Sequence, residues 1–265
     1  MRILITGTTG FVGHKLKASY TDAIAAPSLR NATQDMIKKI VEESEADVVI
    51  HTAAISDIGT CQKDPQSSYF ANVQIPLYLA AACKDRKLIC FSSDQVYSAC
   101  KEDGPYIEEV VKPGNIYAEH KLEMEERVLE LVPSAVMLRA EWMYDYVSPK
   151  PNYFLNVLHA SQQVSFSSRQ FRGITYLKEV VENMDHVMAL PGGVYNFGSE
   201  TNQSMYKITE QFLQLLGKDV QLHDALPRHN LWMNCEKARK YGVEFSDASD
   251  GLKRCLNDYK TTIKQ

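Results

Sequence analysis

Short apolar runs alternate with amphipathic segments through the first half of the chain. The apolar runs have the length of buried strands and lie at 3–6, 23–26, 48–52, 88–92 and 135–139. The segments between them repeat apolar residues with helical spacing, at 12–20, 34–44, 67–85 and 116–132. Strands that alternate with helices predict an α/β fold, in which a doubly wound parallel sheet is covered by helices on both faces.

The alternation becomes less regular after residue 139. Two prolines, Pro149 and Pro151, indicate a crossover. Helices are predicted beyond it at 153–161, 178–190, 205–216, 235–241 and 250–259. Strands near 164–166 and 194–197 are expected to complete the sheet. We therefore predict one domain over 1–145 and a smaller C-terminal lobe that takes up most of 146–265.

The composition excludes several classes of protein but does not identify one. The 265 residues are 45% hydrophobic and 23% charged, as in ordinary globular proteins. The net charge of −4 provides no basic surface for nucleic acid or acidic membranes, and no run of 18 apolar residues predicts a membrane helix. Six cysteines without Cys-x-x-Cys or metal-ligand spacing predict reduced thiols, no metal site and a cytoplasmic protein.

The first predicted strand runs directly into a glycine-rich turn. Gly7, Gly10 and Gly13 follow it at intervals of three, with Phe11 and Val12 between the last two. Glycine permits a tight turn and a close approach of a diphosphate to the backbone, and the N-terminus of the following helix attracts its negative charge. A plain strand–helix connection is the alternative, but this setting favours a Rossmann-type dinucleotide site.

The residues after the second predicted strand bear on which dinucleotide binds. An acidic residue at this point would bind the ribose 2′-hydroxyl of NAD. The sequence at 27–31 carries no carboxylate and includes Arg30, whose guanidinium suits a 2′-phosphate. This pattern favours NADP and leaves NAD as the alternative.

Tyr117 and Lys121 lie four residues apart at the start of a long predicted helix. At this spacing both side chains share one helix face, and the ammonium favours the phenolate, so that Tyr117 could exchange a proton near neutral pH. The same spacing occurs at Tyr97/Lys101, which runs into a turn, and at Tyr146/Lys150, which Pro149 interrupts. Only Tyr117 and Lys121 are therefore predicted to act together.

Ser93 precedes Tyr117 by 24 residues and completes a known pattern. Together with the glycine turn, these residues resemble the extended, nucleotide-sugar branch of the short-chain dehydrogenase/reductase superfamily. Within that branch, the chain is most similar to the dTDP-4-dehydrorhamnose reductases. The matching segments are 51–54, 61–65, 71–73, 92–97, 138–142 and 169–176.

The resemblance implies a role for each matching position. Tyr117 would be the general acid, Lys121 would lower its pKa and bind the nicotinamide ribose, and Ser93 would orient the reacting carbonyl oxygen. The nicotinamide would lie beside Ala53, Ala54 and Ile55. Asp94 would lie in the sugar site beside Ser93, Trp142 would pack against the sugar, and Gln170 and Arg172 would lie near the nucleotide diphosphate. Trp142 as core and Arg172 as a surface charge are the alternatives.

The chain also departs from the patterns of related enzymes. Dehydratases of the branch carry glutamate where this chain has Gln95, so elimination of water is disfavoured. The rhamnose-reductase pattern has aspartate, glycine and proline at the positions of Arg169, Arg172 and Ile174, and Val-Asp at 58–59. These differences lie in the substrate lobe, so the sugar itself is not identified.

Three functions follow as hypotheses. The first is an NADP-dependent reductase that acts on the 4-keto group of a nucleotide-linked sugar through Ser93, Tyr117 and Lys121. The second is a nucleotide-sugar epimerase with tightly held NAD. The third is a regulatory subunit that binds nucleotide without catalysis, like the beta subunit of methionine adenosyltransferase. A homodimer would be compatible with each of them.

Overall fold

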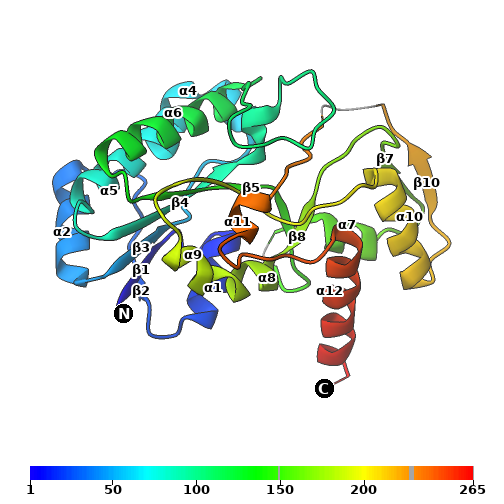
Figure 1. The fold of residues 1–265 in the computed structure, drawn as a ribbon. Helices are drawn as coiled ribbons and strands as arrows, with labels where there is room; N and C mark the ends of the chain where they lie inside the picture. The colour runs from blue at the N-terminus through cyan, green and yellow to red at the C-terminus, as the bar shows by residue number, and fades with distance from the viewer. Residues whose placement is uncertain (149, 227–229, 265) are drawn as a thin grey trace.

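A six-stranded parallel sheet forms the centre of the computed structural model, which describes residues 1–148, 150–226 and 230–264 (Figure 1). The strands lie in the order β2-β1-β3-β4-β5-β9. Their bounds are β1 Ile3–Thr6, β2 Ile24–Ala25, β3 Val48–His51, β4 Lys87–Ser93, β5 Val136–Ala140 and β9 Gly193–Phe197. The predicted doubly wound α/β fold is confirmed. Strand order reverses between β1 and β3, where folds of this kind bind ligands.

Helices cover both faces of this sheet, because successive side chains of a buried strand point to opposite sides. Ile3 and Ile5 of β1 join the core beneath helices α1 (Phe11–Ser19), α8 (Leu177–Glu182) and α9 (Met184–Ala189). Leu4 joins the core on the other face. That face is covered by α2 (Gln34–Ser44), α5 (Ile75–Ala82) and α6 (Ile116–Leu131). Each fully buried aliphatic side chain contributes about 1.5–3 kcal/mol.

Capping residues decide where the helices that carry the site begin. The Asn115 side chain accepts a hydrogen bond from the backbone N–H of Ala118 at 2.9 Å, so α6 begins one residue before Tyr117. The single helix predicted at 67–85 is α4 (Pro65–Tyr69), a π-helical turn (Phe70–Gln74) and α5. A short helix, α3 (Ile58–Lys63), precedes them and was not predicted from the sequence.

The remaining elements form a lobe beside the sheet (Figure 1). Two small parallel sheets belong to it: β6 (Trp142–Tyr144) pairs with β8 (Ile174–Tyr176), and β7 (Gln163–Phe166) pairs with β10 (Gln221–Asp224). Its helices are α7 (Tyr153–Leu158), α10 (Met205–Leu216) and α12 (Ala248–Thr262). The short α11 (Glu236–Arg239) packs against β9.

One of the two strands expected to complete the central sheet does not join it. β9 joins the sheet, as expected for 194–197, and lies beside β5, but the prediction for 164–166 is wrong, since β7 pairs with β10 in a separate sheet. Strands inside a doubly covered sheet are apolar on both faces. In β7, Gln163 and Ser165 are exposed, so the strand suits a small sheet that is open to solvent on one side.

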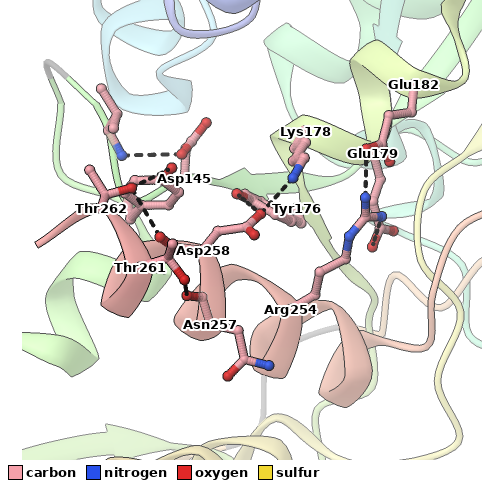
Figure 2. A network of polar contacts seen from close by, with 12 residues as sticks. Asp145, Tyr176, Lys178, Glu179, Glu182, Arg254, Asn257, Asp258, Thr261 and Thr262 are labelled. Carbon is pink, nitrogen blue, oxygen red and sulfur yellow. Dashed lines mark hydrogen bonds and ion pairs between the residues drawn. The ribbon is translucent and has the colours of Figure 1, made fainter. Parts of the chain in front are cut away.

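A polar network joins the lobe to the helix that follows the glycine turn (Figure 2). Lys15 of α1 forms an ion pair of 2.6 Å with Asp145, whose side chain is fully buried. Asp258 of α12 contacts Tyr176 at 3.1 Å and Lys178 at 2.8 Å. Breaking a buried pair by removing one partner is costly, so the Lys15–Asp145 pair fixes α1 against the lobe.

Candidate active site

A cleft of about 1510 Å³ opens at the carboxyl ends of β1, β3, β4 and β5. Its wall contains most of the residues that the sequence singled out, which are Gly7, Gly10, Phe11, Val12, Arg30, Ala53, Ala54, Ile55, Ser93, Asp94, Tyr117, Lys121 and Trp142. Gly13, Gln170 and Arg172 are the predicted site residues that do not line it. Parallel strands end at the same edge of a sheet, and this edge gathers segments that are far apart in the sequence.

The glycine turn at one end of the cleft leaves no room for side chains beneath it. Gly7 has a φ of 69°, and a Cβ there would lie 2.7 Å from the Ala53 backbone nitrogen. A Cβ on Gly13 would lie 2.3 Å from the Gly7 carbonyl oxygen. Helix α1 then begins after Gly10 with no side chain that caps its N–H groups. An uncapped helix N-terminus beside exposed backbone fits the diphosphate of a dinucleotide.

The segment 53–55 beside this turn is held by Asn72, whose role the sequence analysis did not predict. Asn72 is fully buried in the π-helical turn. Its side chain accepts a hydrogen bond from the Ile55 N–H at 3.2 Å and donates one to the Ile55 carbonyl at 2.9 Å. This pairing fixes the backbone of the cleft wall, and a polar residue within an otherwise apolar helical stretch is the signal that could have identified it.

Tyr117 lines the cleft and is only 6% exposed. Burial raises the pKa of its phenol well above the usual value, and the nearby Asp94 carboxylate raises it further. A hydrogen bond with Ser93 acts in the opposite direction. The phenol therefore carries its proton at neutral pH and can donate it to an oxygen that becomes basic.

The position of Lys121 bears on its expected effect on the pKa of Tyr117, which stays a prediction. The Lys121 ammonium lies 5.9 Å from the centroid of the Tyr117 ring and donates a hydrogen bond of 2.7 Å to the Phe91 carbonyl. Burial lowers its own pKa to about 8. His51 nearby has a pKa of about 3, lowered by burial and by Lys121, so the imidazole is neutral. At neutral pH the Lys121 ammonium is therefore mostly charged, and it lies beside the Tyr117 ring.

A buried ion pair anchors the segments that carry Ser93 and Lys121. Arg139 at the end of β5 contacts Glu125 of α6 at 2.7 Å, and both side chains are at most 3% exposed. Glu125 also accepts a hydrogen bond from Ser92, and Arg139 donates one of 2.8 Å to Tyr97. This network was not predicted from the sequence, although Glu125 shares the helix face of Lys121, which lies four residues earlier.

The residues expected at the sugar and diphosphate end of the site differ in exposure. Trp142 is 42% exposed and lines the cleft, so it is not a core residue. Arg172 is 2% exposed, so it is not a surface charge. It forms an ion pair with Asp94, and the centre of its guanidinium lies 3.9 Å from the centroid of the Trp142 ring. Gln170 is buried, and its backbone carbonyl accepts a hydrogen bond from the Met205 N–H at 2.9 Å.

Glu141 is a buried acid in the cleft that the sequence analysis quoted but gave no role. Burial, with a further contribution from Asp94, raises the pKa of its carboxyl to about 8. One carboxyl oxygen accepts hydrogen bonds from the Thr175 hydroxyl at 2.6 Å and the Ser199 N–H at 2.9 Å. Gln95, which takes the place of the dehydratase glutamate, also lines the cleft and accepts a hydrogen bond from Asn115 at 3.3 Å.

Residues 1–148, 150–226 and 230–264 contain no group of three or more histidine, cysteine, aspartate or glutamate side chains that could hold a metal ion. None of the helices that the structure describes is long and apolar enough to cross a membrane.

The match to a protein family follows this geometry. A family model described as the RmlD substrate binding domain matches residues 1–261. The chain belongs to this family. The resemblance to dTDP-4-dehydrorhamnose reductases is thereby confirmed.

Curated relatives of this RmlD-family chain carry reductase names. A dTDP-4-dehydrorhamnose reductase of Mycolicibacterium smegmatis is 33% identical over 54% of the chain, and the match covers 46% of that relative. A probable low-salt glycan biosynthesis reductase of Haloferax volcanii is 33% identical over 82% of the chain and 76% of its own length. The alignment with the second relative thus includes most of residues 146–265.

Solved structures share the same fold. The crystal structure of dTDP-4-dehydrorhamnose reductase from Bacillus anthracis, in complex with NADP, superposes with a TM-score of 0.84. The superposition covers 97% of this chain and 98% of that chain, at 19% sequence identity. At this identity the likeness demonstrates the fold, and the chemistry is argued from the residues of the cleft.

Proposed function

We propose that this protein is an NADP-dependent oxidoreductase that reduces the 4-keto group of a nucleotide-linked sugar. The observation that carries the proposal is a buried, protonated phenol, Tyr117, beside Ser93 and Lys121 in a cleft that also contains an uncapped glycine turn. Membership of the RmlD family and the reductase names of relatives support the same reaction class.

The residues of the cleft fit NADP along its whole length. The glycine turn and the start of α1 would hold the diphosphate, and Arg30 would contact the 2′-phosphate. The lining at 26–31 contains no carboxylate that would favour NAD. Lys121 would bind the nicotinamide ribose, with Ala53, Ala54 and Ile55 beside the ring. When bound, the reduced nicotinamide supplies the hydride, and a related reductase was crystallised with NADP.

The side chains of the cleft supply the proton. The Ser93 hydroxyl, which otherwise donates to Asp94, would turn to donate its single hydrogen bond to the carbonyl oxygen and hold it beside Tyr117. As the carbonyl carbon gains the hydride, the electrons of the C=O double bond move to the oxygen, which takes the proton of the Tyr117 hydroxyl. Lys121 would stabilise the phenolate that remains. Gln95 has no ionisable group, so the site is not equipped to eliminate water.

We propose that the two ligands divide between two parts of the chain. Residues 1–145, completed by β9, would bind NADP, and the sugar nucleotide would lie between this domain and the lobe in 146–265. Trp142 supports this division, because it lies at the start of the crossover into the lobe and exposes its ring to the cleft.

Substitution of Tyr117 by phenylalanine tests the proposal. Tyr117→Phe removes only the hydroxyl, so turnover of 4-keto nucleotide sugars should fall about 10²- to 10⁴-fold, while the affinity for NADPH is retained. Turnover is followed by the loss of the near-ultraviolet absorbance of NADPH, and affinity by its fluorescence. Tyr241→Phe is the matched control, because Tyr241 is 48% exposed.

Each alternative gives a different outcome. A wild-type protein that oxidises no NADPH with any sugar of a broad 4-keto panel contradicts the proposal. Purification with tightly bound NAD, followed by sugar interconversion without net oxidation, identifies an epimerase. Binding of NADPH without turnover, together with a co-purified enzyme whose rate changes on binding, identifies a regulatory subunit.

A further inference from the structure

Arg172 is a buried cation directly behind the wall of the cleft. Strand β8 brings it there, because Ile174 pairs with Trp142 in a parallel register and Arg172 comes two residues earlier. Its guanidinium lies 3.9 Å from the centroid of the Trp142 ring. Stacking at this distance is an attractive cation–π contact that restrains the indole. The indole is nevertheless 42% exposed, so it remains available to a ligand in the cleft.

The same guanidinium reaches the residue next to Ser93. Arg172 forms an ion pair with Asp94, and the two side chains are 2% and 3% exposed. The Ser93 hydroxyl in turn donates a hydrogen bond of 3.2 Å to Asp94. Arg172 is therefore joined through one carboxylate to the serine that is proposed to orient the substrate, and through one stacking contact to the indole of Trp142.

The backbone beside Arg172 cannot shift easily. A Cβ on Gly173 would lie 1.9 Å from the Ser199 carbonyl oxygen and 2.2 Å from the Glu141 carboxylate, so this segment packs directly on its neighbours. A buried guanidinium also carries a large desolvation penalty unless it is paired.

We propose that Arg172 is a positioning residue of the sugar subsite and not a ligand of the nucleotide diphosphate. It holds the Trp142 indole and the Asp94 carboxylate in place, so that the indole and the Ser93 hydroxyl meet the sugar together. This inference rests on the proposed function for what occupies the cleft. The ion pair with Asp94 and the stacking on Trp142 engage the guanidinium that a phosphate would otherwise bind.

Two substitutions separate the charge of Arg172 from its shape. Arg172→Met removes the cation but keeps a long side chain, whereas Arg172→Lys keeps the charge and loses the planar stacking surface. Both are made together with Trp232→Phe, which leaves Trp142 as the only tryptophan of the chain. Arg169→Met in the same background is the matched control, since Arg169 is exposed and lies three residues away.

The first measurement needs no substrate. Acrylamide quenching of the Trp142 fluorescence should become at least about twofold more efficient in Arg172→Met, because the indole loses the group that covers it. Arg169→Met should leave it unchanged. Unchanged quenching in both Arg172 variants, with folding verified by circular dichroism, overturns the proposal whether or not any sugar is turned over.

The second measurement distinguishes positioning from phosphate binding. In Arg172→Met, kcat for the keto sugar should fall about 10- to 100-fold, as expected when reacting groups are misplaced. Inhibition by free thymidine or uridine diphosphate should change less than about twofold, since the phosphates do not contact this residue. Arg172→Lys should recover part of kcat through Asp94.

Opposite results would refute the assignment. Nucleoside diphosphate inhibition that weakens in parallel with kcat would make Arg172 a phosphate ligand. Kinetics of Arg172→Met that match those of Arg169→Met would leave the residue without a role in the site. If the wild-type protein turns over no keto sugar, the proposed function fails, and the quenching result alone decides whether Arg172 holds the indole.

Discussion

Glu141 is expected to make the protein less stable as pH rises. Its folded-state pKa is raised from 4.5 to about 8, so the folded chain keeps a proton that the unfolded chain releases. Between these two values the folded state binds more protons, and the free energy of unfolding falls as pH rises. Asp94, Arg172 and Cys235 are the titratable groups coupled to it, and only Arg172 favours its charged form.

The size of this effect follows from the two pKa values. Because they differ by about 3.5, ionisation of Glu141 costs about 5 kcal/mol of stability above pH 8, and about 3 kcal/mol at pH 7. This is a large fraction of the 5–15 kcal/mol that typically stabilises a domain. Substitution by glutamine should remove the cost, because a glutamine oxygen can still accept from Thr175 and Ser199.

Urea unfolding at a series of pH values measures this effect. The stability difference between Glu141→Gln and wild type should be small near pH 5, grow by up to about 1.4 kcal/mol per pH unit, and level off above pH 8. Glu130→Gln is the control, because Glu130 is exposed on α6. Parallel stability curves for Glu141→Gln and wild type across this window would refute the reasoning.

Two further substitutions test the glycine turn and the buried ion pair that support the cleft. Gly13→Ala would place a methyl group 2.3 Å from the Gly7 carbonyl oxygen, so urea unfolding should show an overpacking cost of about 1–3 kcal/mol, and the displaced turn should weaken NADPH binding in a fluorescence titration; unchanged affinity would show that the turn does not contact the cofactor. Arg139→Met would leave Glu125 buried without its partner, and urea unfolding should show a loss of about 3–5 kcal/mol. The double variant Glu125→Gln, Arg139→Met should recover part of that loss, and no recovery would contradict the pairing argument.

The central sheet was predictable because each of its strands has a recognisable local sequence pattern. Residues 3–5 and 48–50 are apolar on both faces and are soon followed by glycine or small residues, so their burial and their place in a parallel sheet follow from the sequence. The proximity of Tyr117 to Lys121 follows from helix geometry alone. Helix ends were predictable where a cap is present, as at Gly217, which adopts a φ of 63°.

Features that depend on pairing between distant segments were not predictable. The pairing of β6 with β8 decides that Arg172 reaches Trp142 and Asp94, and no local pattern encodes this register. The protonated state of Glu141 depends on burial by Gly173 and Gly198, which close over its carboxylate. The 164–166 strand was assigned to the wrong sheet because an apolar residue at every second position specifies a strand but not its partner.

The return of the chain to its first sheet constrains how this protein is made. Between β5 and β9 the chain passes through β6, α7, β7 and β8. Residue 197 must therefore be synthesised before the sheet can be complete. A fragment that stops at 145 would expose one edge of β5 as an unpaired strand, which invites aggregation. Truncation at the apparent boundary should therefore yield insoluble protein, and a nucleotide-binding fragment would have to retain β9.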